Sequence, residues 1–477
     1  MPTSLARFLL LTGFVVSLTT QCVSAQDATP WPPPLKGAQK GTATVEQASF
    51  LEVPKSVAEL AAKETSAKFV VAKTPPKVQI AFHDQLGTAA VTRRLWSSWG
   101  DIGLAKNGQV YVAIGDHGND VGGDARCFLY RWDPKTAELK QIVDMNQVIP
   151  PKEGQPAWSK VHAKVDEGPD GLIYFSCTLN DGNRAKVPPA GSKIPNYGFH
   201  EGLPGGQLYR YDPTTGQTSV FASLPTRRCT ATSILDQQRN LWWCNLEAGE
   251  GNALWCLDLK TGKPLYQGEE KSVGFNRNFA LGNDGTIYFN GELAGEDAPL
   301  MRLNLADKTV HKTKSVFKGS PGMRCTTRET KDGQIYGITY KNTQLFRYDT
   351  RQDELEMLGN DWLGGSYVAV CELSPDEKYM YYLPGAHGKA WNDGTPVIQY
   401  NLATRQQKVI AFLAPTLDKE LEYVPGGTYG IKLSADGSVL YVNFNGHPGD
   451  RLRPAKMKPI GFGLTSFAAI HIPASER

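Results

Sequence analysis

The stretch Asn283–Phe289 (NDGTIYF) decides the fold, because variants of it recur along the chain. Its Asp-Gly pair is typical of a tight turn whose backbone matches the twist of the two flanking strands. The β-branched and aromatic residues that follow favour a strand. Each copy therefore predicts a β-hairpin. The hairpin turns are expected at Asn107-Gly108, Asp170-Gly171, Arg239-Asn240, Asp284-Gly285, Asp332-Gly333, Asp376-Glu377 and Asp436-Gly437.

Most of these hairpins are followed by a segment that predicts a third strand, in which leucine and an aromatic residue precede arginine, a second aromatic residue and aspartate. This segment is clearest at Leu129–Asp133, Leu208–Asp212 and Leu345–Asp349. Successive hairpin turns lie 63, 69, 45, 48, 44 and 60 residues apart. A four-strand unit of roughly 45 residues, repeated around an axis, is typical of a propeller. The seven copies predict an all-β, seven-bladed β-propeller with four-stranded antiparallel blades over residues 76–477.

The two ends of the repeat region indicate how the ring closes. The last copy runs through Ile470–Ile472 and leaves too few residues for a fourth strand. Upstream of the first copy, Lys77–Phe82 alternates like a strand. We expect Lys77–Phe82 to pair with the last copy as its outer strand, because such pairing removes an open sheet edge.

The N-terminal segment has the features of an export signal. Arg7 precedes an apolar run from Phe8 to Leu18, and Val23-Ser24-Ala25 is a small-x-small cleavage pattern. Residues 1–25 are therefore predicted to be a signal peptide, which makes the protein secreted or periplasmic. The apolar run is about half of what a membrane anchor needs, and no membrane span is expected after cleavage. Residues 26–75 are predicted to be a linker with a short helix over residues 56–66.

Composition narrows the class of partner. The net charge of +3 is small for 477 residues, and Lys and Arg are dispersed. This argues against nucleic acid or an anionic membrane as the principal partner. Seven cysteines follow residue 25, and none forms a C-x-x-C pair, so a zinc knuckle or thiol redox motif is not expected. Several lie in predicted strands, where a buried cysteine acts as a small hydrophobic residue. The disulfide pairing and the oligomeric state stay open.

One face of the predicted propeller is elaborated. The start of each innermost strand and each loop between the second and third strands lie on this face. These loops are long and polar, and such loops on a rigid scaffold commonly carry function. The inner-strand starts supply Trp99, Asp101, His162, Arg228, Arg277, Arg324, Tyr367 and Tyr429. The loops supply His117, His200, His387 and His447, with the carboxylates Asp116, Asp120, Glu201, Glu247, Glu250 and Glu292.

These residue types favour a small anionic or carbohydrate-type ligand. Arg228, Arg277 and Arg324 either bind a carboxylate, since each guanidinium offers a planar fork, or hold structural groups between blades. Trp99 and the tyrosines offer stacking surfaces for a sugar ring. The predicted substrate-binding residues are Trp99, Arg228, Arg277 and Arg324.

Two reactions suit such a face. In β-elimination from a uronate, arginines neutralise the carboxylate, His162 or His117 removes the adjacent proton, and Tyr367 or Tyr429 protonates the leaving oxygen. Alternatively, three histidines with a carboxylate hold one divalent metal ion (Ca, Mn or Zn) that activates water for lactone opening. The candidate metal ligands are His117, His162, His200, His387 and His447. Asp116–Asp124 is a further candidate calcium loop, although it lacks the full spacing pattern.

The repeat around Asn283–Phe289 resembles the seven-bladed propellers of the gluconolactonase and streptogramin-lyase superfamily. Oligogalacturonate lyases, also seven-bladed and metal-dependent with a histidine cluster, are a more distant likeness. The resemblance covers Trp96–Pro473 and implies architecture, because no catalytic motif of these families can be placed residue by residue.

The leading hypothesis is an exported lyase or lactone hydrolase. The alternative is a non-catalytic propeller that binds a ligand or a protein. A quinone-dependent dehydrogenase would repeat a tryptophan motif in every blade, and these blades do not.

Overall fold

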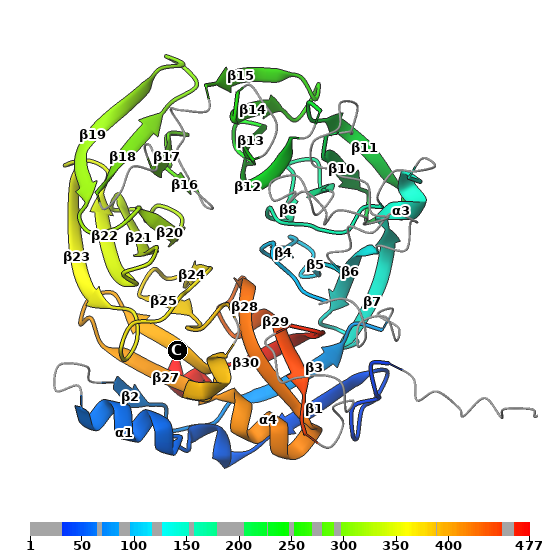
Figure 1. The fold of residues 1–477 in the computed structure, drawn as a ribbon, viewed down its shortest axis with the longest axis vertical. Helices are drawn as coiled ribbons and strands as arrows, with labels where there is room; N and C mark the ends of the chain where they lie inside the picture. Colours follow the sequence, from blue (N-terminus) through cyan, green and yellow to red (C-terminus); the bar gives the residue numbers. More distant parts are fainter. Residues whose placement is uncertain are drawn as a thin grey trace, which may run out of the picture.

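Seven β-sheets surround a central axis in the computed structural model (Figure 1). The structure describes residues 31–63, 69–84, 96–116, 126–151, 157–178, 205–226, 228–247, 252–269, 279–290, 297–387, 389–450 and 462–477. Within each sheet, successive strands run from the axis to the rim. The predicted all-β, seven-bladed β-propeller with four-stranded antiparallel blades is confirmed.

The first four blades each contain four strands in chain order. Blade 1 is β4 (Gly103–Leu104), β5 (Val110–Gly115), β6 (Cys127–Asp133) and β7 (Glu138–Asp144). Blade 2 is β8 (Asp166–Glu167), β9 (Ile173–Cys177), β10 (Gln207–Tyr211) and β11 (Thr218–Ser223). Blade 3 is β12 (Cys229–Asp236), β13 (Leu241–Glu247), β14 (Leu254–Asp258) and β15 (Pro264–Gly268). Blade 4 is β16 (Ala280–Leu281), β17 (Ile287–Asn290), β18 (Ala298–Leu303) and β19 (Val310–Phe317).

The remaining three blades complete the ring. Blade 5 is β20 (Met323–Thr326), β21 (Gln334–Thr339), β22 (Gln344–Asp349) and β23 (Glu354–Asn360). Blade 6 is β24 (Cys371–Leu373), β25 (Tyr379–Tyr382), β26 (Pro396–Asn401) and β27 (Gln407–Phe412). Blade 7 takes β28 (Tyr423–Leu433), β29 (Val439–Pro448) and β30 (Leu464–His471) from the end of the chain.

The predicted turns join the first and second strands of the blades. Backbone φ is positive at Gly108, Gly171, Gly285, Gly333 and Gly437, which is the conformation that glycine adopts at little cost. The two turns without glycine place Asn240 and Glu377 at φ 57° and 60°. The turn residues that revealed the repeat are therefore the ones that the hairpin geometry requires.

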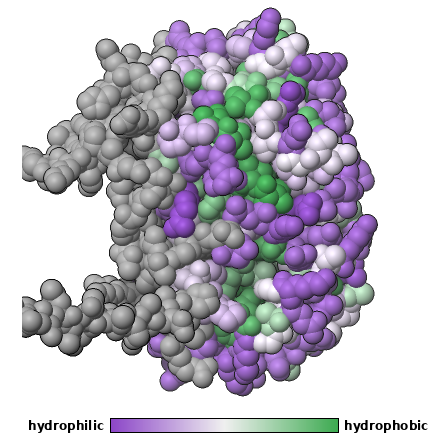
Figure 2. Space-filling view, turned by 90° about the vertical axis from the view of Figure 1, so that its right-hand side faces the viewer, coloured by the Kyte–Doolittle hydropathy of each residue, from purple (hydrophilic) through white to green (hydrophobic). Residues whose placement is uncertain are grey.

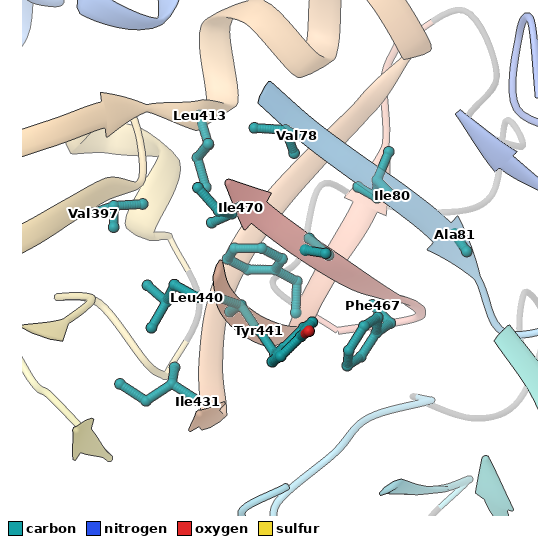
Figure 3. Packing of buried hydrophobic residues seen from close by; sticks show 14 of the residues in the cluster. Val78, Ile80, Ala81, Val397, Leu413, Ile431, Leu440, Tyr441, Phe467 and Ile470 are labelled. Carbon is teal, nitrogen blue, oxygen red and sulfur yellow. The ribbon is translucent and has the colours of Figure 1, made fainter. Parts of the chain in front are cut away.

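The ring closes with a strand from the N-terminal part of the chain, as predicted. Strand β3 (Lys77–Phe82) pairs antiparallel with β30, with Val78 opposite Ile470 and Ile80 opposite Ala468. Figure 3 shows Val78 and Ile80 on β3 beside Ile470 in the core of blade 7. Both side chains are fully buried, so the closing strand contributes apolar packing as well as backbone hydrogen bonds.

The segment predicted as a linker also joins the blades. Strand β1 (Thr42–Glu46) adds a fifth strand to blade 7 by pairing with β3, and β2 (Phe69–Val71) adds a fifth strand to blade 6, parallel to β27. Between them lie η1 (Ala48–Leu51) and α1 (Lys55–Lys63), and α1 overlaps the short helix predicted for residues 56–66. Figure 1 shows these blue elements along the rim of blades 6 and 7.

Few helices interrupt the ring. Helix α3 (Met145–Val148) follows blade 1, η4 (Ala390–Asp393) lies in the hairpin between β25 and β26, α4 (Leu413–Leu421) joins blades 6 and 7, and η5 (Ala474–Glu476) follows β30. Among the described residues, no helix has the length and apolar character needed to cross a membrane. Residues 1–25 lie outside the described residues, so the signal peptide stays a prediction.

Figure 2 shows mainly hydrophilic residues, with an apolar band, on the side of the ring formed by the rims of blades 1 and 2.

Candidate functional site

The inner-strand starts form a small pocket at one end of the central channel, which we call the upper pocket. Its volume is about 30 Å³. Six blades contribute to its wall: Trp99, Asp101, His162, Lys164, Ala231, Thr232, Arg324, Ala369, Val370 and Tyr429. The structure thus brings together four of the residues singled out from sequence for catalysis or substrate binding, namely Trp99, His162, Arg324 and Tyr429.

Arg324 is held in the wall by two tyrosines. Its Nε–H group donates a hydrogen bond to the phenol oxygen of Tyr367. The guanidinium carbon lies 5.1 Å from the ring centre of Tyr367 and 5.8 Å from that of Tyr429. Burial acts to lower the pKa of Arg324, but Tyr367 and Tyr429 outweigh this effect and raise the pKa above its usual value. A permanent positive charge is therefore fixed at the pocket with its Nε engaged, which leaves the terminal amino groups to recognise a ligand.

Four rings extend the pocket into an aromatic cluster. The ring centre of His387 lies 4.1 Å from that of Tyr367 and 6.0 Å from that of Tyr429. The ring of Trp99 lies 4.7 Å from that of Tyr429, and its Nε1–H donates to the hydroxyl of Ser97 at 2.7 Å. His387 is exposed, whereas Tyr429 is buried. The cluster therefore joins the buried pocket to the protein surface.

His162 has a defined orientation in the upper pocket. Its Nδ1 lies 2.7 Å from the carbonyl oxygen of Ala231. Because a carbonyl oxygen only accepts hydrogen bonds, Nδ1 must carry the hydrogen and donate it. The other ring nitrogen, Nε2, is consequently the atom at which His162 can take up or release a proton. This geometry suits the general-base role predicted for His162.

Other candidate residues do not reach the upper pocket. Arg228 is buried directly before β12 and does not line this pocket. His447 was predicted to lie in a loop, but it belongs to β29, because β28 and β29 continue to pair as far as Tyr423 and Pro448. Its ring packs edge-on against Trp391 at 4.8 Å. The carboxylate of Asp116 accepts a hydrogen bond from the backbone of Arg126 at 3.0 Å.

The rest of the predicted set cannot be placed. The following lie outside the described residues: His117, Asp120, His200, Glu201, Glu250, Arg277, Glu292 and the side chain of Glu247. The calcium loop proposed for Asp116–Asp124 lies outside them beyond Asp116.

The described part of the chain does not form a metal centre. No group of three or more His, Cys, Asp or Glu side chains within it could hold a metal ion. The titratable side chains of the upper pocket are His162, whose Nδ1 is bound to a carbonyl, together with Arg324, Lys164, Asp101 and Tyr429. Two cations against one carboxylate favour an anion over a metal cation as the ligand of this pocket.

A charged network begins in the wall of the upper pocket with Asp101 and Lys164, and of its members only Asp101 was singled out from sequence. The Lys432 Nζ lies 3.2 Å from Glu372 Oε2 and 3.8 Å from Asp101 Oδ2, and the Lys164 Nζ lies 4.0 Å from the same oxygen of Asp101. Burial raises the pKa of Glu372. Burial acts to lower the pKa of Lys432, but Glu372 and Asp101 outweigh it and raise the pKa. The available signal was a charged residue between two apolar ones in an inner strand, as in Ile431-Lys432-Leu433.

A larger cavity, which we call the lower cavity, lies beyond this network. Its volume is about 370 Å³, and Lys164 lines both the lower cavity and the upper pocket. The first-hairpin turns at Asp236–Arg239 and Gly282-Asn283 contribute to its wall, together with Asp166, Glu372 and Lys432. Burial raises the pKa of Asp166. The two hollows therefore lie in sequence along the channel, with charged residues between them.

Comparisons with known proteins agree with the fold. No family model matches the chain, and no curated protein sequence matches it. The solved structure of an oligogalacturonate lyase in complex with manganese is similar, with a TM-score of 0.50 and 14% identity, over 86% of this chain and 96% of that one. The hydrazine synthase of Kuenenia stuttgartiensis gives a TM-score of 0.49 with 14% identity, over 75% of this chain and 94% of that one. A chain of the mitotic checkpoint complex gives 0.47 with 9% identity, over 85% and 95%.

At 14% sequence identity, the structural similarity to the oligogalacturonate lyase shows a shared fold and says nothing about the reaction. The chain is a seven-bladed β-propeller whose fold is similar to that of an oligogalacturonate lyase, and the expected distant likeness is confirmed at the level of the fold.

Proposed function

We propose that the protein is an enzyme that acts on a carboxylate-bearing sugar or lactone at the upper pocket. The observation that carries the proposal is the Arg324 guanidinium, fixed by Tyr367 within a pocket that also contains His162. An arginine fork binds a carboxylate through two parallel hydrogen bonds. A buried, permanently charged arginine beside a histidine and two phenol groups is suited to bind an anion and to transfer protons.

In the lyase form of the reaction, Arg324 binds the substrate carboxylate and stabilises the negative charge that develops when the adjacent C–H bond breaks. His162 Nε2 accepts that proton, because Nδ1 is committed to Ala231. Tyr367 or Tyr429 gives a proton to the departing oxygen. In the hydrolase form, His162 activates a water molecule that opens the lactone, and Arg324 stabilises the resulting carboxylate.

The predicted divalent metal ion has no assigned step in this proposal. The described residues do not form a metal centre. A metal content measurement on the purified protein tests the predicted ion independently of activity.

Binding without chemistry is the second candidate function. The observation that favours it is the volume of the upper pocket, about 30 Å³, whereas ligand sites commonly have roughly 300–1,000 Å³. A pocket of this size accommodates a carboxylate group while the rest of the ligand lies on the aromatic cluster. Such a protein would bind the same anion and release it unchanged.

We also propose that the protein is exported to the periplasm or the extracellular medium and meets a small anionic or carbohydrate-type partner. Export rests on the features of residues 1–25, and the partner rests on the charge of Arg324.

The test is an activity assay on uronate oligosaccharides and sugar lactones. β-Elimination is followed by the ultraviolet absorbance of the unsaturated product, and lactone opening by proton release. We expect Arg324→Gln to lower kcat/KM by about a hundredfold, the range found when a charge-stabilising donor is removed. Arg405→Gln is the matched control, because Arg405 pairs with Glu356 on the exposed rim. Binding of galacturonate that depends on Arg324, without product, would establish the second candidate. Neither binding nor turnover would refute both.

A further inference from the structure

Four of the seven described cysteines occur as two pairs that bridge neighbouring blades. Cys127 begins β6 in blade 1, and Cys177 ends β9 in blade 2. Cys325 lies in β20 of blade 5, and Cys371 begins β24 of blade 6. In each pair the partner thiol contributes to raising the pKa of Cys127 or Cys371, which indicates that the two side chains are neighbours.

Each pair also lies within a single apolar cluster. Cys127 and Cys177 pack in the cluster between blades 1 and 2, which includes Tyr209. Cys325 and Cys371 pack in the cluster between blades 5 and 6, which includes Tyr382. All four side chains are buried, so the thiols are held in place by packing on every side. Neighbouring thiols that share one cluster need little backbone movement to form a bond.

The other three cysteines all lie in blade 3. Two of them, Cys244 and Cys256, show that a position on adjacent strands does not by itself bring two thiols together. Cys244 of β13 is opposite Trp255, and Cys256 of β14 is opposite Trp243. Because side chains alternate between the two faces of a sheet, Cys244 and Cys256 point to opposite faces of the blade. They accordingly belong to two different apolar clusters. Adjacent strands thus separate these thiols, whereas adjacent blades bring the two pairs together.

We propose that Cys127 with Cys177, and Cys325 with Cys371, form two disulfide bonds that each join neighbouring blades. In each reaction two thiols lose two protons and two electrons and form one S–S bond. A disulfide-bearing thiol oxidoreductase accepts both and becomes a dithiol, so the exchange balances. The reaction requires an oxidising compartment and therefore accompanies export. It does not depend on the proposed enzymatic function.

The environment of the thiols sets the time at which the bonds form. Thiol–disulfide exchange requires a thiolate, and burial raises the pKa of the Cys127 and Cys371 thiols. An external oxidant also cannot reach a fully buried sulfur. Oxidation must therefore take place while the blades are docking, before the clusters close over the four thiols.

The experiment counts titratable thiols in denatured protein, using the chain from residue 26 with its seven cysteines. After refolding in a glutathione redox buffer we expect three titratable thiols, namely the seven cysteines minus the four in the two pairs. Addition of the same buffer to the folded, reduced protein should leave all seven titratable over the same period. Peptide mapping without reductant should recover the Cys127–Cys177 and Cys325–Cys371 links.

Variants separate these links from general effects on folding. The double variant Cys127→Ala/Cys177→Ala should lower Tm by about 4 °C relative to the oxidised protein, since the bond closes a loop of about 50 residues in a large domain. The matched control Cys256→Ala should leave both linked peptides in the map. Should the first double variant fail to fold, Cys325→Ala/Cys371→Ala and the map of the unaltered protein provide the same test. Seven titratable thiols after oxidative refolding, or links between other cysteines, would overturn the proposal.

Discussion

Arg324 in blade 5 donates its Nε–H to the phenol oxygen of Tyr367, a residue of the segment that enters blade 6. The same guanidinium lies 5.8 Å from the ring centre of Tyr429 in blade 7. The cation of blade 5 is thus oriented by tyrosines from blades 6 and 7, and its position in the upper pocket depends on how these three blades pack.

The Tyr367→Phe variant tests this orientation. It keeps the ring that faces Arg324 and removes only the hydrogen-bond acceptor, so the guanidinium loses its fixed direction. Because a hydrogen bond to a charged group contributes about 1.5–3 kcal/mol, we expect galacturonate to bind roughly tenfold or more weakly by calorimetry. Tyr379→Phe in the same blade is the control, since Tyr379 belongs to β25 and is not one of the two tyrosines that contact Arg324. Equal affinity in Tyr367→Phe and the unaltered protein would contradict the assigned role.

His83 predicts how stability depends on pH. It directly follows the closing strand, is fully buried, and has its Nδ1 2.9 Å from the hydroxyl of Thr465. Burial lowers the pKa of His83 to about 4. In the unfolded chain the pKa is about 6.5, so between these values the unfolded state binds a proton that the folded state does not. The contribution is present above pH 6.5 and is lost as the pH falls to 4, by about 3 kcal/mol in total.

The measurement for His83 is urea unfolding at pH 7.5 and at pH 4.5. His83→Gln cannot titrate, so its free energy of unfolding should fall less between the two pH values than that of the unaltered protein. His311→Gln serves as a control because His311 is exposed on blade 4. An unchanged pH dependence in His83→Gln would show that other groups cause the acid sensitivity.

Lys432→Met tests the charged network in the channel. The change leaves Glu372 and Asp101 close together without their nearest cation. Removing one partner of a largely buried ion pair leaves an uncompensated charge, and we expect the free energy of unfolding to fall by about 2 kcal/mol. The double variant Lys432→Met/Glu372→Leu should recover part of this loss in chemical denaturation. A double variant less stable than Lys432→Met would argue against charge as the cause.

Ile80→Ala tests the closure of the ring. Ile80 is fully buried on β3, and its truncation leaves a cavity in the core of blade 7 (Figure 3). The free energy of unfolding should fall by about 2–4 kcal/mol. Val70→Ala on β2 is the control, because 40% of Val70 is exposed, and it should change stability by less than about 1 kcal/mol. Similar losses of unfolding free energy in the two variants would mean that the packing of β3 does not stabilise the closed ring.

Most of the fold could be predicted from sequence because its information is local. Each hairpin can be recognised by a turn such as Asp284-Gly285, and the number of these turns gives the number of blades. The closing role of Lys77–Phe82 followed from the missing strand in the last copy. Strands β1 and β2 could not be predicted in this way. Their partners are chosen by the edges of blades assembled far along the chain, and a pattern as short as Phe69–Val71 does not encode them.

The site was predicted less completely, because the turn spacing identifies the blades but does not give the exact start of each inner strand, and a shift of one residue turns a side chain to the other face. Arg228 and Arg324 occupy comparable places at the start of β12 and β20, yet only Arg324 lines the upper pocket. Loop length placed His387 and His447 on one face, but His447 continues β29 and packs against Trp391. Lys164 was missed because a single lysine just before an inner strand resembles an ordinary solvated charge until the channel is assembled.

The pairing of β3 with β30 has a consequence for the order of events during synthesis. His83, directly after β3, and Thr465, in β30, are 382 residues apart in the chain and in contact in the folded protein. The ribosome therefore makes the closing strand before blades 1–6 and its partner strand after them. Blades 1–6 can stack as they emerge, but the early strand waits with an unpaired edge until the final hairpin arrives. Closure of the ring thus joins a strand made before the blades to one made after them, a slow, long-range event of the kind expected for high contact order.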